Sequence, residues 1–426
     1  MTEPDLLARF HGVRAGTARL TEGLAPEDFV VQSMDEVSPT KWHLAHTTWF
    51  WEAFVLSKLR SGYRPFHPRY HYLFNSYYAQ AGERHCRAQR GYLSRPTVAE
   101  VMEYRRYVDD GMTELIAHAC GDAGGTELTD LIELGLNHEQ QHQELMLTDL
   151  KHVFSVNPLR PVYRAGAPTE GTEATATDAS PPVRWIEFEG GLEQVGWEGR
   201  GFHFDNEAPR HRRFLEPFEL ADRLVTNGEY LSFLEDGGYR RSELWMSEGW
   251  AQLQAEEWTE PFYWEKRGGE WWIFTLSGMR PLDLGEPACH LTWFEADAFA
   301  RWSGVRIPRE DEWEVAAATL PIVGNLAETE RFHPQPISHS SEAKGLRQMF
   351  GDVWEWTASS YSPYPGFVPL EGVVGEYNGK FMCGQFVLRG GSCATPGTHL
   401  RPTYRNFFHP GAAWQFTGVR LARDPS

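Results

Sequence analysis

The chain has 426 residues, a formal net charge of -19 at pH 7 and 14% aromatic residues, including 17 tryptophans. This length predicts roughly two or three domains, and the acidic charge argues against a nucleic-acid partner, whose phosphates require a basic surface. No apolar run reaches the roughly 18 residues of a membrane span, no secretory signal pattern is apparent, and the five cysteines form no Cys-x-x-Cys pair. We therefore expect a cytoplasmic protein without a disulfide scaffold or a membrane partner.

Amphipathic helices are predicted throughout the first part of the chain. They are expected at residues 5–24, 38–59, 97–120 and 126–154. Ser38 and Pro39 suit a helix cap and the first helical position, and the glycine-rich residues 121–125 suit a helix stop and a turn. This succession predicts an up-and-down four-helix bundle.

The last of these helices carries His-Glu-Gln-Gln-His at residues 138–142. On a helix, His138 and His142 share one apolar stripe. Burying two imidazoles without partners costs a few kcal/mol each, and this spacing suits two ligands of one ion. His46 lies on an inward stripe with Trp42 and Trp49, so it is the best third ligand. A hydrogen-bonded core network is the alternative.

The same five residues match the H-E-x-x-H signature of zinc metalloproteases. Such an enzyme uses the glutamate as a base and takes a third ligand from further downstream. Residues 143–151 contain no His-x-x-Gly-x-x-His continuation, and Glu144 and Asp149 lie too close in sequence to be that ligand. A protease is therefore kept only as an alternative.

The connection at residues 62–94 is rich in tyrosine and arginine. It is too long for a plain turn, and its aromatic residues disfavour disorder. We expect Tyr77, Tyr78 and three arginines to lie over a site, with a packed surface loop as the alternative. The arginines are Arg84, Arg87 and Arg90.

Beyond residue 157 the character of the chain changes twice. Residues 158–182 consist largely of Ala, Thr, Pro and Glu without an apolar period, which is typical of a linker. From residue 183 onward, short apolar runs, many glycines and scattered tryptophans predict short strands and irregular loops. Helices are expected after Asn227, before the turn at Ser303 and after Pro308.

Five motifs of this second part resemble the formylglycine-generating enzymes, or sulfatase-modifying factors. They are Val-Thr-Asn-Gly-Glu-Tyr (225–230), Thr-Trp (292–293), Arg-Ile-Pro-Arg-Glu-Asp-Glu-Trp-Glu (306–314), Gly-Asp-Val-Trp-Glu-Trp (351–356) and Arg-Gly-Gly-Ser (389–392). Cys383 and Cys393 are too far apart in sequence to match the catalytic cysteines of those enzymes. Copper chemistry is therefore not expected in this domain.

The first half resembles a DinB-type bundle with a three-histidine metal site. Trp-His-Leu-Ala-His (42–46) followed by His-Glu-Gln-Gln-His (138–142), joined to such a second domain, is similar to the EgtB-type sulfoxide synthases of ergothioneine biosynthesis. The resemblance implies an α+β fold. It would comprise a DinB-like helical domain (1–157), a linker (158–182) and a formylglycine-generating-enzyme-like, C-type-lectin-like domain (183–426).

The resemblance also implies an oxidoreductase with a non-haem Fe(II) held by His46, His138 and His142. Three neutral imidazoles leave the ion its full double charge, which favours an anionic thiolate ligand beside dioxygen. The substrates would be hercynine, a thiol and O2, joined by a carbon–sulfur bond at imidazole C2 with formation of a sulfoxide. The Asn-Ser-Tyr-Tyr match assigns the proton donor to Tyr77 or Tyr78 and indicates the subgroup that uses free cysteine.

Further residues are implied as substrate contacts. Gln141 would hydrogen-bond the hercynine imidazole, and Asn406 would hold its carboxylate. Phe408 stands at the position where family members that use gamma-glutamylcysteine have an acidic residue. Trp414 and Phe416 are candidates for the pocket that binds the trimethylammonium group. Arg87 and Arg90 are candidates for binding the carboxylate of the thiol substrate.

Alternatives remain within and outside this family. A selenoneine synthase or an ovothiol-type synthase that uses histidine would share the fold. A zinc protease or a metal-free, lectin-like binding module would differ in class. The sequence predicts neither the oligomeric state nor a structural ion in the second domain.

Overall fold

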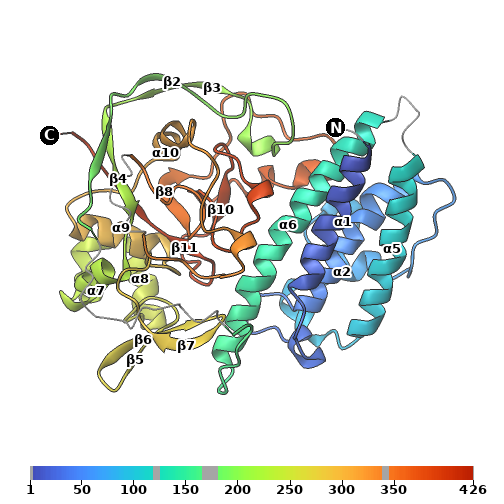
Figure 1. The fold of residues 1–426 in the computed structure, drawn as a ribbon, viewed down its shortest axis with the longest axis horizontal. Helices are drawn as coiled ribbons and strands as arrows, with labels where there is room; N and C mark the ends of the chain where they lie inside the picture. Colours follow the sequence, from blue (N-terminus) through green and yellow to red (C-terminus); the bar gives the residue numbers. More distant parts are fainter. Residues whose placement is uncertain (1–2, 119–124, 166–180, 338–344, 426) are drawn as a thin grey trace. The chain divides into compact units, whose positions relative to one another are not determined.

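Long helices form the first part of the chain, and every described strand follows residue 184 (Figure 1). The computed structural model describes residues 3–118, 125–165, 181–337 and 345–425. The fold is α+β, as predicted. It divides into unit 1, which contains Met1–Tyr163 and Leu370–Tyr377, and unit 2, which contains Arg164–Pro369 and Asn378–Ser426.

Unit 1 is built on helices that correspond to those predicted. They are α1 (Glu3–Arg19), α2 (Thr40–Phe50) with its continuation to Leu59, α5 (Val98–His118) and α6 (Gly125–Val156). Helices α1 and α2 each pack against both α5 and α6, so their apolar faces meet in one core. The predicted end of the third helix at residues 119–120, most of the turn at 121–125 and most of the linker at 158–182 lie outside the described residues.

Two details of the second helix differ from the prediction. It begins at Thr40 with Pro39 as its N-cap, so Ser38 does not cap it. The backbone N–H of Ser38 instead donates to Asp149 Oδ2 over 2.8 Å. The helix then widens into a π-helical stretch over Trp51–Leu56, a local irregularity that is frequent at functional sites.

A tight contact lets this π-helical stretch approach α6. Trp51 is fully buried and lies directly over Gly135, where an added Cβ atom would come within 2.4 Å of the indole ring. Only glycine leaves room for the ring at that position.

The connection at residues 62–94 contains three short helical turns. These are α4 (Tyr70–Phe74) and 3-10 turns at Ala79–Ala81 and Arg87–Tyr92. The Glu376 carboxylate accepts hydrogen bonds from the backbone N–H groups of Ala79 (2.9 Å) and Gln80 (2.8 Å). A segment distant in sequence, Leu370–Tyr377, therefore belongs to unit 1, which the sequence analysis did not predict.

The described residues of unit 2 form four small sheets. Their orders are β1-β4-β12, β10-β9-β8-β11, β2-β3 and β5-β6-β7. The strands are β1 (Trp185–Phe188), β2 (Gly191–Val195), β3 (His211–Leu215), β4 (Phe218–Leu224), β5 (Trp264–Arg267), β6 (Glu270–Thr275), β7 (Gly278–Pro281), β8 (Trp354–Ser360), β9 (Phe386–Arg389), β10 (Asn406–Phe408), β11 (Thr417–Gly418) and β12 (Arg420–Arg423). Among these strands, β11 pairs with β8 in parallel and the other pairs are antiparallel.

Three helices described in unit 2 lie where the sequence predicted them: α7 (Asn227–Glu235), α9 (Trp293–Trp302) and α10 (Glu310–Ala317). A further helix, α8 (Ser247–Glu256), was not predicted. Thr226 and Glu229 form a reciprocal capping box at the start of α7, as Thr292 and Glu295 do at α9. Each box satisfies backbone N–H groups that the helix start would otherwise leave unpaired.

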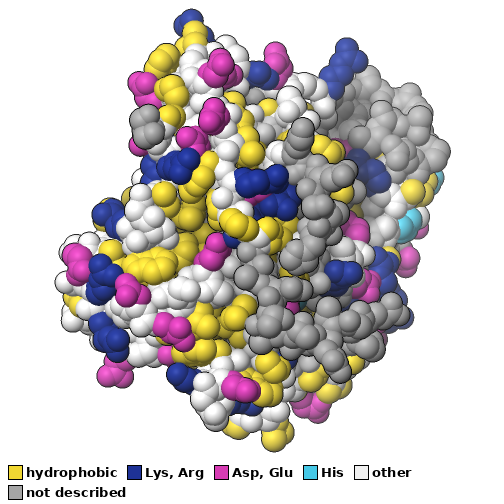
Figure 2. Space-filling model, turned by 60° about the vertical axis from the view of Figure 1, so that its left-hand side comes forward, with side chains coloured by type: hydrophobic (Ala, Val, Ile, Leu, Met, Phe, Trp, Pro, Cys, Tyr) yellow, Lys and Arg dark blue, Asp and Glu magenta, His cyan; other side chains and the backbone are white. Residues whose placement is uncertain are grey.

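Acidic and basic side chains are mixed on the described surface. Figure 2 shows a face on which lysine and arginine side chains are scattered among acidic ones over the described part. Among the described helices, none combines the length and the apolar character that crossing a membrane requires.

Candidate metal centre

Three imidazoles converge inside unit 1. His46 comes from α2, and His138 and His142 come from successive turns of α6. Each offers one ring nitrogen, and these three atoms lie within 4.8 Å of one another. The Nε2 atoms of His46 and His138 are 3.2 Å apart. The structure thus brings together the three histidines that the sequence analysis selected.

The ring of His46 is held on several sides. Its Nδ1–H donates to the carbonyl oxygen of Phe74 over 2.6 Å, so the lone pair lies on Nε2, which faces the other two histidines. Trp42 stacks on the ring with centroids 4.6 Å apart, and Trp49 stacks on it at 5.4 Å. His46 can therefore present its lone pair without first ordering its side chain.

The protonation of the three histidines suits metal binding. Burial lowers the pKa of His138 to about 3 and holds the pKa values of His46 and His142 well below 6.5, with the neighbouring imidazoles adding to the effect for the latter two. All three rings are therefore neutral at pH 7, which is the form that ligates metals. The buried Nδ1 of His138 has no hydrogen-bond partner among the described residues.

These observations show that the residues fit a divalent transition metal. Three neutral nitrogen donors, close together and buried, match the imidazole sites of Fe, Zn, Cu and Ni. No carboxylate belongs to the described group, so a bound ion would keep its full charge.

The glutamate of His-Glu-Gln-Gln-His has a different role from that in a zinc protease. Glu139 is completely buried and accepts hydrogen bonds from Arg14, Arg105, Thr17 and Trp51. Burial alone would raise the pKa of Glu139, but the two guanidinium groups lower it to about 2. A carboxylate so engaged is not available as a base at the metal, which removes the main support for the protease alternative.

Tyr77 and Tyr78 are linked to His46 through Trp49, which contacts both Tyr78 and His46. The two tyrosine rings stack with centroids 4.6 Å apart, and Tyr78 also contacts Trp49 at 5.8 Å and Phe54 at 5.1 Å. Tyr78 is fully buried. Burial, supported by the nearby phenols, raises its pKa well above 10, so the hydroxyl keeps its proton at neutral pH.

Tyr377 is a candidate that the sequence analysis missed. Its hydroxyl donates to Gln141 Oε1, and its ring centroid lies 5.8 Å from that of His138 and 6.3 Å from that of Tyr77. Tyr377 stands in a glycine-containing stretch without helical or strand periodicity. No local sequence signal indicates that this stretch joins unit 1.

The two predicted arginines differ in environment. Arg90 is buried, its guanidinium lies 3.3 Å from the Trp42 ring centroid, and it donates to Ser38 Oγ over 2.8 Å. Burial lowers the pKa of Arg90 well below its usual value, and no described carboxylate forms an ion pair with it. Arg87 is exposed and donates to the carbonyl oxygen of Glu36.

The remaining predicted contacts belong to unit 2. Asn406 and Phe408 are half-buried on β10, where the Asn406 side chain accepts a hydrogen bond from the Phe407 backbone over 2.9 Å. Trp414 is half-buried, and Phe416 is fully buried with its ring 5.0 Å from that of His290. This packing suits a core aromatic, and the substrate contacts of all four residues remain predictions.

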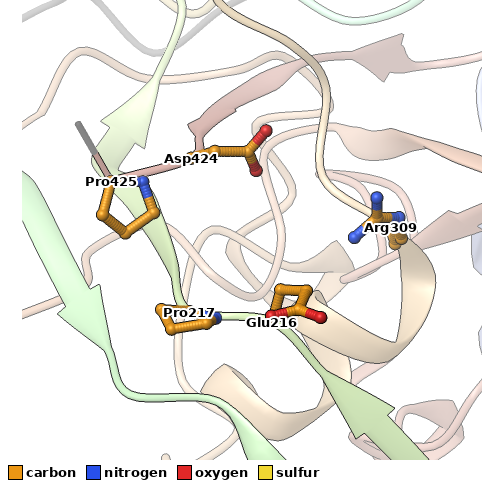
Figure 3. A pocket seen from close by; sticks show the side chains of 5 residues that line it. All are labelled: Glu216, Pro217, Arg309, Asp424 and Pro425. Atoms are coloured by element: carbon orange, nitrogen blue, oxygen red, sulfur yellow. The ribbon is translucent and has the colours of Figure 1, made fainter.

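Unit 2 also carries a surface pocket of about 360 Å³ (Figure 3). Its lining consists of Glu216, Pro217, Arg309, Asp424 and Pro425. None of the predicted site residues belongs to this lining.

Two family models match successive parts of the chain. Residues 9–146 match the DinB superfamily, and residues 172–425 match the sulfatase-modifying factor enzyme 1-like domain. Treponema denticola variable protein 1 has a solved structure that covers 57% of this chain and 95% of its own at 16% identity, with a TM-score of 0.36. That similarity is too low to add to the description of the fold.

Curated relatives match along the length of the chain. The hercynine oxygenase of Mycobacterium tuberculosis is 32% identical over the whole of both chains. That of Mycolicibacterium thermoresistibile is 31% identical over 91% of this chain and 88% of its own, and that of Mycolicibacterium smegmatis is 34% identical over 68% and 71%. The two family models cover successive parts of the chain, and a hercynine oxygenase matches it from end to end. The chain therefore belongs to the EgtB-type hercynine oxygenase family of oxidoreductases.

Proposed function

We propose that the protein is a non-haem iron(II)- and O2-dependent sulfoxide synthase that joins cysteine to C2 of the hercynine imidazole. The observation that carries this proposal is the buried group of His46, His138 and His142 in a chain whose relatives are hercynine oxygenases. One oxygen atom of O2 would become the sulfoxide and the other would leave as water. The four electrons that O2 accepts come from forming the C–S bond and from oxidising the sulfur.

The three histidines would hold the iron through neutral ring nitrogens. Bound Fe(II) would supply the redox chemistry that couples dioxygen to the thiol and the imidazole. Burial of the rings keeps competing water away, and the stacking of Trp42 and Trp49 on His46 limits its rotation.

Tyrosines are proposed as the proton donors. Tyr78 keeps its proton at neutral pH because its burial disfavours the phenolate. Tyr377, from the segment Leu370–Tyr377, lies against His138 and donates a hydrogen bond to Gln141. A phenol can deliver a proton and take it back without leaving a lasting charge in the buried site.

Arg90 is proposed to bind the carboxylate of the thiol substrate. A buried guanidinium without a carboxylate partner is costly, and a substrate carboxylate would relieve that cost with a charge-assisted hydrogen bond. Arg90 lies over Trp42, which stacks on His46. A thiol substrate whose carboxylate is bound by Arg90 would therefore lie beside the metal. Arg87, being exposed, would contribute less.

Hercynine would be bound from both halves of the sequence. Gln141 is proposed to hydrogen-bond its imidazole, and Asn406 to hold its carboxylate. Trp414 and Phe416 are proposed for the trimethylammonium group through cation–π attraction. Phe408, in place of an acid, favours cysteine over gamma-glutamylcysteine. We also propose the cytoplasm as the compartment, since the sequence has an odd number of cysteines, five, and no Cys-x-x-Cys pair.

The decisive experiment is anaerobic reconstitution with Fe(II), followed by turnover with hercynine and 18O2. Cysteine, gamma-glutamylcysteine and a selenosugar are offered in parallel, and histidine replaces hercynine in a separate series. We expect a product from cysteine that carries one labelled oxygen. Failure of every thiol to react would refute the sulfur-transfer proposal, and product from the selenosugar alone or from histidine would favour the selenoneine or ovothiol alternative.

A further inference from the structure

An unbroken line of hydrogen-bonding groups runs from His142 into the protein interior. The Nδ1 atom of His142 lies 2.9 Å from Nδ1 of His43, and Nε2 of His43 lies 2.9 Å from Oδ2 of Asp149. All three side chains are buried. His43 comes from α2, whereas His142 and Asp149 lie about two turns apart on α6.

The chemistry of these contacts determines where the hydrogens lie. An ionised carboxylate only accepts hydrogen bonds, so His43 must place a hydrogen on Nε2 to bond Asp149. A neutral His43 then has only a lone pair on Nδ1. His142 must consequently donate from its own Nδ1–H, which leaves the lone pair of His142 on Nε2.

The opposite arrangement would disable the site. If His142 accepted a hydrogen bond at Nδ1, the hydrogen of its neutral ring would lie on Nε2. A nitrogen that carries a hydrogen has no lone pair for a metal.

We propose that Asp149 and His43 form a positioning pair that fixes the tautomer and orientation of His142, so that its Nε2 lone pair faces the metal position. This inference rests on the proposed metal centre. Carboxylates often orient a metal-binding histidine directly; here a second imidazole transmits the effect. Neither Asp149 nor His43 would touch the metal, the hercynine or the thiol.

The position of Asp149 is itself well defined. The same Oδ2 atom that faces His43 accepts the backbone N–H of Ser38 at 2.8 Å. Ser38 precedes α2, so this bond ties the beginning of α2 to α6. The carboxylate therefore cannot turn away from His43 without also breaking a buried backbone hydrogen bond, which costs about 1–3 kcal/mol.

The first test reads the tautomers directly. Long-range 1H–15N correlation spectra of the metal-free full chain, labelled with 15N-histidine, distinguish the two neutral tautomers. The spectrum of a His43→Gln variant identifies the His43 signal. We expect hydrogen on Nδ1 of His142 and on Nε2 of His43, and the reverse assignment at either ring would overturn the proposal.

The second test measures Co(II) affinity by chelator competition, together with the visible spectrum of bound Co(II). His43→Leu removes the acceptor for His142, and we expect its affinity to fall about 10- to 100-fold. His43→Gln can still accept from His142 through Oε1 and donate to Asp149, so its affinity should lie between those of wild type and His43→Leu. Asp149→Asn removes the charge but keeps the shape, and a smaller loss is expected.

A matched control separates positioning from general loss of stability. Glu133→Gln removes a negative charge from the same helix, where the carboxylate pairs with Arg9. It should bind Co(II) as the wild type does. Wild-type affinity in His43→Leu would overturn the proposal, and if that variant does not fold, the tautomer spectra still decide.

Neither measurement depends on turnover. Correct tautomers and a weakened metal site in an enzyme that never forms a sulfoxide would refute the proposed function alone. Incorrect tautomers in an active enzyme would refute only the positioning pair.

Discussion

Replacing Glu139 by glutamine should destabilise the protein strongly. The substitution keeps the size of the side chain but removes the charge that faces Arg14 and Arg105. Glu139 is 0% exposed, and Arg14 Nη1 approaches its Oε2 to 2.9 Å. Breaking a buried ion pair from one side leaves an uncompensated charge, which costs about 3–5 kcal/mol.

The pKa of Glu139 gives a second route to this magnitude. Burial opposes ionisation, but the two guanidinium groups lower the pKa from 4.5 to about 2, which corresponds to roughly 3 kcal/mol in favour of the folded state. Because the folded-state pKa is depressed, this contribution is fully present above pH 4.5 and is lost as the pH falls towards 2.

Denaturant unfolding of the full chain, followed by tryptophan fluorescence, measures the effect. Glu133→Gln is the control, because its partner Arg9 is 37% exposed although Glu133 itself is only 10% exposed, and a guanidinium that reaches solvent is less costly to leave unpaired than the buried Arg14 and Arg105. We expect a much lower midpoint for Glu139→Gln, and a smaller acid sensitivity between pH 4.5 and 2 than in the wild type. Equal midpoints for the two variants would refute the structural role, and lost catalysis with unchanged stability would restore Glu139 as a catalytic base.

Four further substitutions test the centre and its packing. His142→Ala should abolish metal binding, measured by elemental analysis after reconstitution, and full iron occupancy would remove it from the ligands. Tyr78→Phe and Tyr377→Phe should each slow sulfoxide formation in single-turnover assays while iron stays bound; unchanged kinetics in either variant would exclude that hydroxyl as the proton donor. Gly135→Ala would place a methyl group 2.4 Å from the buried Trp51 ring, so we expect a loss of about 1–3 kcal/mol, and a higher melting temperature would contradict this packing.

The grouping of the three histidines could be predicted because its signal is local. Two of them lie four residues apart on one helix, so periodicity alone places them on the same face. His46 required only that a second helix present an inward histidine among tryptophans. Bundle packing then brings such faces together, and the structure does so within 4.8 Å.

The surroundings of the centre could not be predicted in this way, because they depend on contacts between segments far apart in sequence. His43 stands beside the stripe that contains His46, and nothing in Trp-His-Leu-Ala-His indicates which neighbour it will meet. Asp149 was considered only as a metal ligand, whereas its carboxylate binds His43 and the Ser38 backbone. Its role depends on the relative rotation of two helices.

Tyr377 shows the same limit at greater distance. Its approach to His138 requires residues 370–377 to leave the strand-rich part of the chain and pack on unit 1. Residues 370–377 are attached to unit 1 by the Glu376 carboxylate, which accepts hydrogen bonds from the backbone N–H groups of Ala79 and Gln80. One side chain thus pairs with two backbone groups. Any residues can supply backbone amides, so a sequence pattern marks at most one side of such a contact. The three histidines therefore have a signature that the sequence shows, whereas the groups that contact them from distant segments become visible only in three dimensions.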